Sequence, residues 1–173
     1  MATGVASGEE LATAAVDVIA NQTVYVVRHA IAADRLRWDK PDELRPLTAE
    51  GEAQAERLVG LLGTEDMQRV FSSPSVRCRQ TVAPLARHLG VPVEDLPQVA
   101  EGNLPRLALR ALIDVDVPAV VGCTHGDILE GIVEDLLRQR VRLEGGLKFK
   151  KGSTWVLSVE KGKVTRARYL PPP

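Results

Sequence analysis

Aromatic residues are scarce in this sequence, which contains two Phe, two Trp and two Tyr among 173 residues. Proteins that stack the bases of single-stranded nucleic acid need several aromatic side chains, so this composition argues against such a function. An excess of one charge is also lacking, because the formal net charge is −1. No overall positive field therefore attracts nucleic acid or an anionic membrane. Any anion-binding site must be built from a local group of basic residues.

Cysteine is rare, and long apolar runs are absent. Cys78 and Cys123 are far apart in the sequence and follow no metal-ligand spacing, so we expect two reduced thiols, one in a helix and one in a buried strand. No apolar run is long enough to span a bilayer, and the first residues lack the basic segment of a secretory signal. We therefore expect a cytoplasmic protein with no nucleic-acid or membrane partner, no metal and no cofactor.

The chain has enough apolar residues for one core, since about 45% of its residues are hydrophobic. Residues 1–21 are small and polar at first and then weakly helical, and we interpret them as an N-terminal extension, helical or loosely ordered. Residues 22–173 form the remaining domain, in which β-branched runs alternate with amphipathic segments. This alternation predicts the α/β class, as a three-layer α/β/α sandwich with a largely parallel sheet.

The predicted elements have recognisable boundaries. Thr48 is a suitable N-cap for the first helix, and Gly63 suits its end. Pro84 should kink or split the helix in which it lies, and Gly162 marks a tight hairpin near the end of the chain. The expected helices are 47–63, 75–90, 106–114 and 127–139, and the expected strands are 23–27, 68–73, 91–96, 118–126 and the two of the hairpin.

Polar or basic residues follow three of the predicted strands at the point where each strand ends. In a parallel sheet the carboxyl ends of the strands form the ligand site, and the helices that follow present free N–H groups to anions. Two arginines and two histidines at this edge predict a pocket for a phosphoryl group. The residues concerned are Arg28 and His29 at the end of the first strand, Ser72 and Ser73 at the end of the second with Arg77 on the helix that follows, and His125 and Gly126 at the end of the fourth.

Each of these residues also has a purely structural interpretation. An Arg-His pair alone says little, because it occurs again at Arg87 and His88, where basic residues suit the end of a helix. His29 can be a polar residue that ends a strand and has no function. His125 can cap the helix that follows it, and Arg77 can be a solvated residue on the surface of its helix. Their convergence on one sheet edge favours the phosphoryl pocket over these separate interpretations.

Four segments resemble the histidine phosphatase superfamily, which has the phosphoglycerate-mutase-like fold: VVRHA (26–30), LTAEGEAQA (47–55), FSSPSVRCRQT (71–81) and CTHG (123–126). They occur in the family's order over about a hundred residues. The short chain resembles the small branch that includes phosphohistidine phosphatases. In addition, KGSTWVLS (151–158) is similar to the phosphatase domain that follows a Nudix domain in some nucleotide-cleaning hydrolases, although the Nudix half is absent here.

The resemblance implies a metal-independent phosphatase that forms a covalent phosphohistidine on His29. The unperturbed pKa of histidine is ~6.5, so most of the imidazole is neutral near pH 7. One ring nitrogen can then attack phosphorus while a backbone carbonyl holds the other. Arg28, Arg77 and His125 would then hold the phosphoryl oxygens, which share the developing charge. These arginines would supply the positive charge that a metal ion provides in other phosphatases.

The general acid of the family has two candidates in this sequence. Glu101 is the nearest match to the family's acid, and Asp127 is its rival; some small members lack the acid altogether. The sequence also departs from the family pattern, with Ala30 in place of a glycine and residues 31–33 in place of a polar pair. One phosphate contact of the family is therefore expected to be missing.

Arg45, Arg35, Arg37 and Lys150 are the candidates to hold the rest of the substrate, although a solvated surface charge is the simpler interpretation of each. We expect a phosphoprotein or a small phosphorylated metabolite such as a nucleotide. Without an acid, substrates with good leaving groups are favoured, such as phosphohistidine or a nucleoside diphosphate. A phosphomutase and a non-catalytic phospho-ligand module on the same fold are the alternatives. The mutase needs a lid that the short chain does not offer, and the module usually lacks the nucleophile.

Overall fold

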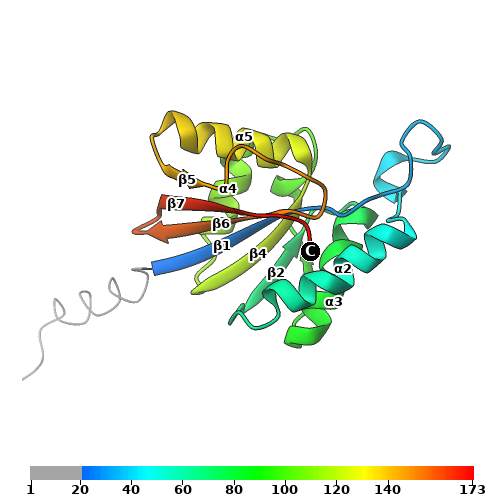
Figure 1. Ribbon diagram of the computed structural model, residues 1–173, viewed down its shortest axis with the longest axis horizontal. Helices are drawn as coiled ribbons and strands as arrows, with labels where there is room; N and C mark the ends of the chain where they lie inside the picture. Colours follow the sequence, from blue (N-terminus) through cyan, green and yellow to red (C-terminus); the bar gives the residue numbers. More distant parts are fainter. Residues whose placement is uncertain (1–20) are drawn as a thin grey trace, which may run out of the picture.

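The computed structural model describes residues 21–173 (Figure 1). The extension expected at residues 1–21 lies outside the described residues, apart from its last residue. Seven strands form one sheet in the order β3-β2-β4-β1-β6-β7-β5. The strands are β1 Asn21–Arg28, β2 Arg69–Ser72, β3 Val93–Asp95, β4 Ala119–Thr124, β5 Arg142–Glu144, β6 Thr154–Glu160 and β7 Lys163–Leu170. The helices are α2 Ala49–Leu62, α3 Val76–Leu89, α4 Pro105–Ile113 and α5 Gly126–Arg138, with 3-10 turns η1 Asp42–Leu44 and η2 Pro97–Val99.

The sheet is mixed, and most of its pairings are parallel. Strands β3, β2, β4 and β1 run parallel to one another, whereas β6 is antiparallel to β1 and β7 is antiparallel to β6. The short strand β5 then pairs in parallel with β7. The expected parallel half of the sheet is therefore confirmed, and it is this half whose carboxyl ends position the site.

Helices cover both faces of the sheet, as expected of a three-layer α/β/α sandwich. Helices α4 and α5 lie on one face, and α2 and α3 lie on the other (Figure 1). Strand β1 serves both core layers, because its side chains point alternately to the two faces. Val24 and Val26 join the cluster under α4 and α5, whereas Tyr25 and Val27 join the cluster under α2 and α3.

Helix α3 corrects one expectation from the sequence. Pro84 lies inside it, and the helix nevertheless runs unbroken from Val76 to Leu89, so of the two expected effects, a kink or a split, the split does not occur. Proline removes one helical hydrogen bond and costs about 3 kcal/mol in a helix interior. Here Cys78 and Leu85, one on each side of the proline, are both buried in the same core cluster. This shared packing keeps the two halves of the helix together.

Local signals elsewhere agree with the structure. The Thr48 hydroxyl accepts a hydrogen bond from the Gly51 amide at 3.1 Å and so caps α2. The two residues between β6 and β7 are Lys161 and Gly162, both with positive φ, which is the geometry of a type I′ hairpin turn. Among the described residues, no helix combines the length and the apolar character that a membrane span requires.

Candidate active site

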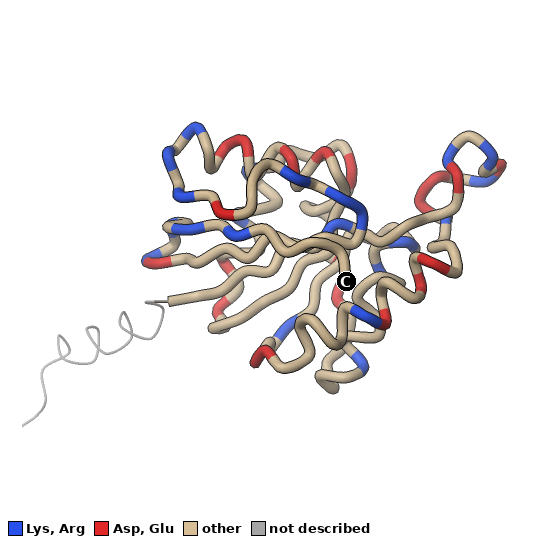
Figure 2. The backbone as a smooth tube through the Cα atoms, viewed as in Figure 1, with Lys and Arg blue, Asp and Glu red and all other residues tan. Residues whose placement is uncertain are grey.

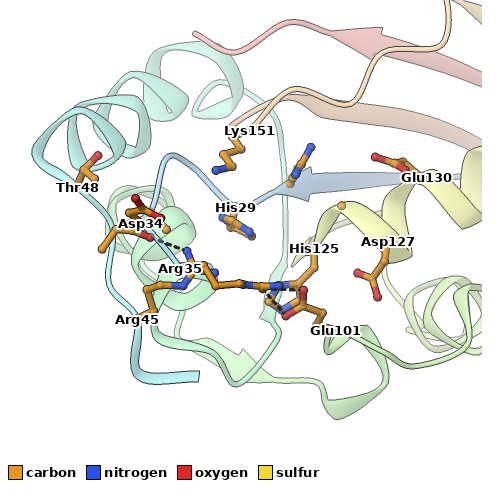
Figure 3. Close-up of a pocket in the computed structure, with 14 residues that line it drawn as sticks. His29, Asp34, Arg35, Arg45, Thr48, Glu101, His125, Asp127, Glu130 and Lys151 are labelled. Carbon is orange, nitrogen blue, oxygen red and sulfur yellow. Dashed lines mark hydrogen bonds and ion pairs between the residues drawn. The ribbon is translucent and has the colours of Figure 1, made fainter. Parts of the chain in front are cut away.

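The two pocket histidines meet because their strands are neighbours. In the parallel pair of β1 and β4, Arg28 lies opposite Thr124, so the residues that follow both strands emerge at the same edge. The rings of His29 and His125 are 5.4 Å apart, edge to face. They lie in a pocket of about 750 Å³ (Figure 3). The pocket is lined by Arg28, His29, Ala32, Ala33, Asp34, Arg35, Arg45, Thr48, Glu101, His125, Gly126, Asp127, Glu130 and Lys151.

His29 is held as a neutral imidazole with one nitrogen occupied. Its Nδ1 lies 2.8 Å from the carbonyl oxygen of Ala30, the kind of backbone contact that the sequence suggested. A carbonyl only accepts, so we assign the proton to Nδ1 and the lone pair to Nε2. Burial lowers the pKa of His29 from 6.5 to about 3, more than the bond to Ala30 raises it, and nearby cationic side chains lower it further. The imidazole is therefore neutral throughout the physiological pH range.

The backbone around His29 is fixed by groups from the other motif segments. The Gly152 amide donates to the carbonyls of Arg28 and His29, both at 3.1 Å. The Thr81 hydroxyl accepts from the Ala30 amide at 3.0 Å and donates to the Arg77 carbonyl at 2.7 Å. Thr81 thus links the turn after β1 to the first turns of α3. Sequence reasoning placed Thr81 within a motif but gave it no task.

Arg28 lies against the start of α5. Its Nη1 donates to the Phe149 carbonyl, and its Nε is buried without a hydrogen-bond partner among the described residues. A Cβ atom on Gly126 would lie only 2.9 Å from the Arg28 Cζ. The glycine predicted as a substrate-binding residue therefore has a definite steric task, which is to leave room for the guanidinium.

Arg77 is buried beneath the pocket and is covered by two carboxylates. Its side chain is 1% exposed. Nη2 donates to Asp42 Oδ2 at 3.0 Å and to Glu101 Oε2 at 3.1 Å, and Nη1 donates to the Asp42 carbonyl at 2.8 Å. Arg77 therefore lies at the predicted place but outside the lining of the pocket. A phosphoryl group reaches its Nη2 only by replacing one of these carboxylates.

His125 is held through both ring nitrogens. Nδ1 lies 3.3 Å from Arg77 Nη2, and Nε2 lies 2.8 Å from the Ser73 hydroxyl. A guanidinium only donates, so Nδ1 accepts and Nε2 carries the proton toward Ser73. The Cys78 thiol is also near, 3.5 Å from Nε2. Ser73 therefore sets the tautomer and the orientation of this ring.

The two cysteines are near each other in space, which their sequence separation did not reveal. Both are free thiols and both are buried. Burial raises the pKa of Cys78, but hydrogen bonds with Cys123 and His125 and nearby positive charge lower it more, so its pKa falls below the usual 9.0. The pKa of Cys123 is raised, first by burial and then by its neighbour Cys78.

The candidate acids differ in their partners. Glu101 accepts from Arg35 through both carboxylate oxygens, at 2.8 and 3.0 Å, and Arg77 adds a third bond. In Figure 3 the Arg35 side chain reaches across the pocket toward Glu101 beneath His125. Both Glu101 oxygens thus act as acceptors and neither offers a proton. Asp127, the rival, lines the pocket and accepts from the Gly102 amide at 2.8 Å.

The outer basic residues are only partly where the sequence suggested. Arg45 lines the pocket and is 4% exposed, with Nε 2.9 Å from Asp42 Oδ1, so its alternative interpretation as a surface charge is wrong. Arg37 is 89% exposed and faces Asp34. Lys151 lines the pocket in the place expected for Lys150, a difference of one residue within a loop. Burial lowers the pKa of Lys151, and the nearby arginines lower it further.

The residues after His29 explain the missing polar pair. Ala30 and Ala32 are buried with Leu47 and Ala55 in a small apolar cluster between the pocket and α2. Ala32 and Ala33 also line the pocket, but their side chains carry no polar group that could contact a phosphate. In the described part of the chain, no three His, Cys, Asp or Glu side chains are grouped so that they would hold a metal ion.

Comparison with known proteins agrees with this geometry. The model of the histidine phosphatase superfamily (branch 1) matches residues 24–115, more than half of the chain. The chain belongs to this superfamily. It is 36% identical over 160 residues to the 8-oxo-(d)GTP phosphatase of Mycolicibacterium smegmatis (strain ATCC 700084 / mc(2)155). That match covers 88% of this chain and 49% of the relative, so the chain spans about half the length of the curated relative.

Solved structures share the fold of this superfamily member. The protein histidine phosphatase SixA, complexed with tungstate, superposes with a TM-score of 0.68 at 21% identity, covering 87% of this chain and 95% of that one. The mycobacterial glucosyl-3-phosphoglycerate phosphatase superposes with a TM-score of 0.60 at 17% identity, covering 86% and 97%. At these identities the likeness concerns the fold, and the predicted phosphoglycerate-mutase-like architecture is confirmed.

Proposed function

We propose that this chain hydrolyses a small phosphorylated metabolite in two steps through a phosphohistidine on His29. The observation that carries the proposal is the state of the imidazole, which donates from Nδ1 to Ala30 and keeps the Nε2 lone pair at neutral pH. In the first step Nε2 bonds to phosphorus, and the leaving oxygen departs with the electron pair of the broken P–O bond. In the second step a water oxygen bonds to phosphorus. The P–N bond then breaks, and its electron pair returns to Nε2 as orthophosphate and a proton leave.

The phosphoryl oxygens are held by donors around His29. Arg28 lines the pocket with a buried Nε that has no partner in the described region. Helix α5 starts at Gly126, and the first backbone N–H groups of a helix favour anions. Arg77 joins these donors when a phosphoryl oxygen takes the place of Glu101 on its Nη2. In this proposal two arginines and a helix start supply the positive charge, so the reaction needs no metal ion.

The leaving group follows from the contacts of Glu101. Both of its oxygens already accept hydrogen bonds from arginine, so it is poorly placed to protonate a leaving oxygen. Substrates whose leaving group needs no proton are favoured, and a nucleoside diphosphate is one of them. The 8-oxo-(d)GTP phosphatase relative supports a nucleotide. Phosphohistidine on a protein is the second candidate, because its imidazole also leaves without a general acid and because the fold of SixA is similar.

A turnover assay with GDP in the presence of EDTA tests this proposal. We expect release of orthophosphate to survive chelation. His29→Ala should lower it at least ~10⁴-fold, because the nucleophile is gone. When GDP that is labelled at its terminal phosphate is mixed with the protein and the reaction is quenched rapidly without acid, the phosphohistidine should be trapped as labelled protein. This label should be missing in H29A.

The matched control is His88→Ala, which removes an exposed histidine at the end of α3. It should keep full turnover and full labelling. Substantial turnover by H29A would contradict the covalent mechanism. Complete loss in EDTA that a divalent ion restores would contradict metal independence. Release from a phosphohistidine protein but not from GDP would favour the second candidate.

A further inference from the structure

Trp38 is the one aromatic residue of the chain that does not belong to the core. The other five aromatic side chains are buried in the two core clusters or pack against them. Trp38 is half-buried in the segment of residues 33–46, here called the rim loop. This segment follows β1, precedes α2 and projects from the body of the molecule (Figure 1). Single exposed apolar side chains are common, so the position of Trp38 matters more than its exposure.

The rim loop holds the indole in a defined place. The loop is closed at its base by the Ala33 amide, which donates to the Pro46 carbonyl at 2.9 Å, and by a bridge between Ala32 and Leu47. Within the loop, Trp38 Nε1 donates to the Pro41 carbonyl at 3.0 Å. The polar edge of the indole is therefore satisfied, and the ring offers a face rather than a hydrogen bond.

A second hollow of about 350 Å³ lies beside the main pocket, lined by Arg35, Trp38, Lys40, Asp42 and Glu101. It shares Arg35 and Glu101 with the main pocket, so the ion pair of these two residues separates the hollows. Their side chains are 55% and 40% exposed, and exposed ion pairs contribute little to stability. A ligand that extends from one hollow into the other therefore passes over an exposed ion pair, whose side chains can shift at small cost.

The rim loop carries residues of both charges, as Figure 2 shows. The Lys40 ammonium lies 5.7 Å from the centre of the Trp38 ring, so a side-chain cation already occupies the face on which a planar ligand would stack. Arg35 and Lys40 supply donors, and Asp42 and Glu101 supply acceptors, to the edge of such a ligand. A planar ring with donors and acceptors along its edge is a nucleobase.

We infer that the second hollow, beside Trp38, is the subsite that binds the base of a nucleoside phosphate whose terminal phosphoryl group lies at His29. The inference rests on the proposed function and names the part of the substrate that sets its specificity. The base displaces the Lys40 ammonium and stacks on the indole, and the phosphate chain passes Arg35. In phosphohistidine the planar ring is bonded directly to the phosphoryl group, so it would lie beside His29 and not in this hollow.

Selectivity between two diphosphates tests the subsite. GDP and inorganic pyrophosphate both present a terminal phosphoryl group on a phosphate leaving group, and only GDP carries a base. Trp38→Ala should lower the ratio of kcat/KM for GDP to that for pyrophosphate about tenfold to a hundredfold, mainly through KM. Trp38→Phe should keep most of the ratio, because a smaller ring still stacks. Leu36→Ala, at a 94% exposed position of the same loop, is the matched control and should keep all of it.

A binding measurement separates the subsite from the proposed reaction. Trp155, the other tryptophan, is fully buried, so added ligand should quench fluorescence from Trp38 alone. GDP titrated into His29→Ala should quench this fluorescence, and the same titration of H29A with Trp38→Phe should not. Quenching without hydrolysis by the unchanged protein would support the subsite and contradict the proposed function. Hydrolysis of GDP without quenching, or an unchanged selectivity ratio in W38A, would overturn the subsite.

Discussion

The two histidines of the pocket are held in complementary proton states by single neighbours. The Ala30 carbonyl accepts a hydrogen bond from Nδ1–H of His29, which leaves Nε2 as the nucleophile. The Ser73 hydroxyl accepts a hydrogen bond from Nε2–H of His125, and Nδ1 of the same ring then accepts one from Arg77. One backbone carbonyl and one hydroxyl thus decide which nitrogen of each ring is available. Neither of these two partners is a charged residue, so both proton positions are set without an ion pair.

Substitution of Glu101 distinguishes a proton donor from an ion-pair partner. We expect Glu101→Gln to change hydrolysis of an alkyl phosphate and of an aryl phosphate by the same factor, and to lower KM a few-fold for both. The reason is that the carboxylate competes with phosphate for Arg77 Nη2, and the neutral amide competes less. Steady-state kinetics with both esters measures the effect, and Asp127→Asn is assayed in parallel.

The opposite pattern would restore Glu101 as the general acid. A strongly basic alkoxide needs a proton in the transition state, whereas a nitrophenolate hardly needs one. General acid catalysis is worth ~10²–10⁴-fold, so an acid would show as a loss of that size for the alkyl ester alone. If Glu101→Gln slows hydrolysis of both esters by the same factor, and Asp127→Asn slows hydrolysis of the alkyl ester alone, Asp127 is the proton donor.

At the scale of elements, the strands and helices of the site could be predicted because local signals were strong. The apolar runs of β1 and β4 and the caps of α2 were legible in the sequence. Strand β5 was missed, since its three residues, Arg142–Glu144, are two charges around one leucine and pair only with the distant β7. The sequence left open whether Pro84 kinks or splits α3, and packing on the sheet keeps the helix unbroken.

The start of α5 gives a prediction at this scale. Gly126→Ala should lower kcat/KM about tenfold to a hundredfold while changing the free energy of unfolding by about 1 kcal/mol or less. The added Cβ would lie 2.9 Å from the Arg28 guanidinium, which is the end of a flexible side chain and can move aside. The helix therefore survives, but a phosphate donor is displaced. Chemical denaturation and turnover, measured on the same preparation, give the two quantities.

Gly60→Ala in α2 is the matched control, because nothing lies within 4 Å of its added Cβ. It should stabilise the protein by up to ~1 kcal/mol through helix propensity and leave turnover unchanged. Equal effects of G126A and G60A on turnover would show that the contact between Gly126 and Arg28 has no bearing on catalysis.

For the whole molecule, sequence reasoning could find which residues meet but not how they are paired. The rule that ligands bind at the carboxyl ends of parallel strands places Arg28, His29 and His125 together without coordinates. The contacts of Arg77 with Asp42 and Glu101 bring together segments far apart in the chain, and no local pattern encodes them. The meeting of Cys78 with Cys123 likewise depends on the packing of α3 against β4.

The burial of His29 makes the stability of the whole molecule depend on pH. Its pKa is about 3 when folded and 6.5 as the ordinary value, so between these limits the unfolded chain binds one proton more. The contribution of a neutral buried imidazole is fully present above pH 6.5 and is lost as the pH falls toward 3. Between pH 7.5 and 5 the loss should be about 2 kcal/mol in the free energy of unfolding.

The variant His29→Gln should lack this loss, because glutamine does not titrate. Urea denaturation of both proteins from pH 8 to 5 should give parallel values above pH 7, where imidazole is neutral in both states, and values that diverge below it. The unchanged protein should lose stability faster as the pH falls. Acidic groups such as Asp42 do not obscure this window: burial raises its pKa, but the neighbouring arginines lower it below 3.8. Parallel curves down to pH 5 would mean that the folded protein protonates His29 as readily as the unfolded chain does. The nucleophile would then not be held neutral by its burial.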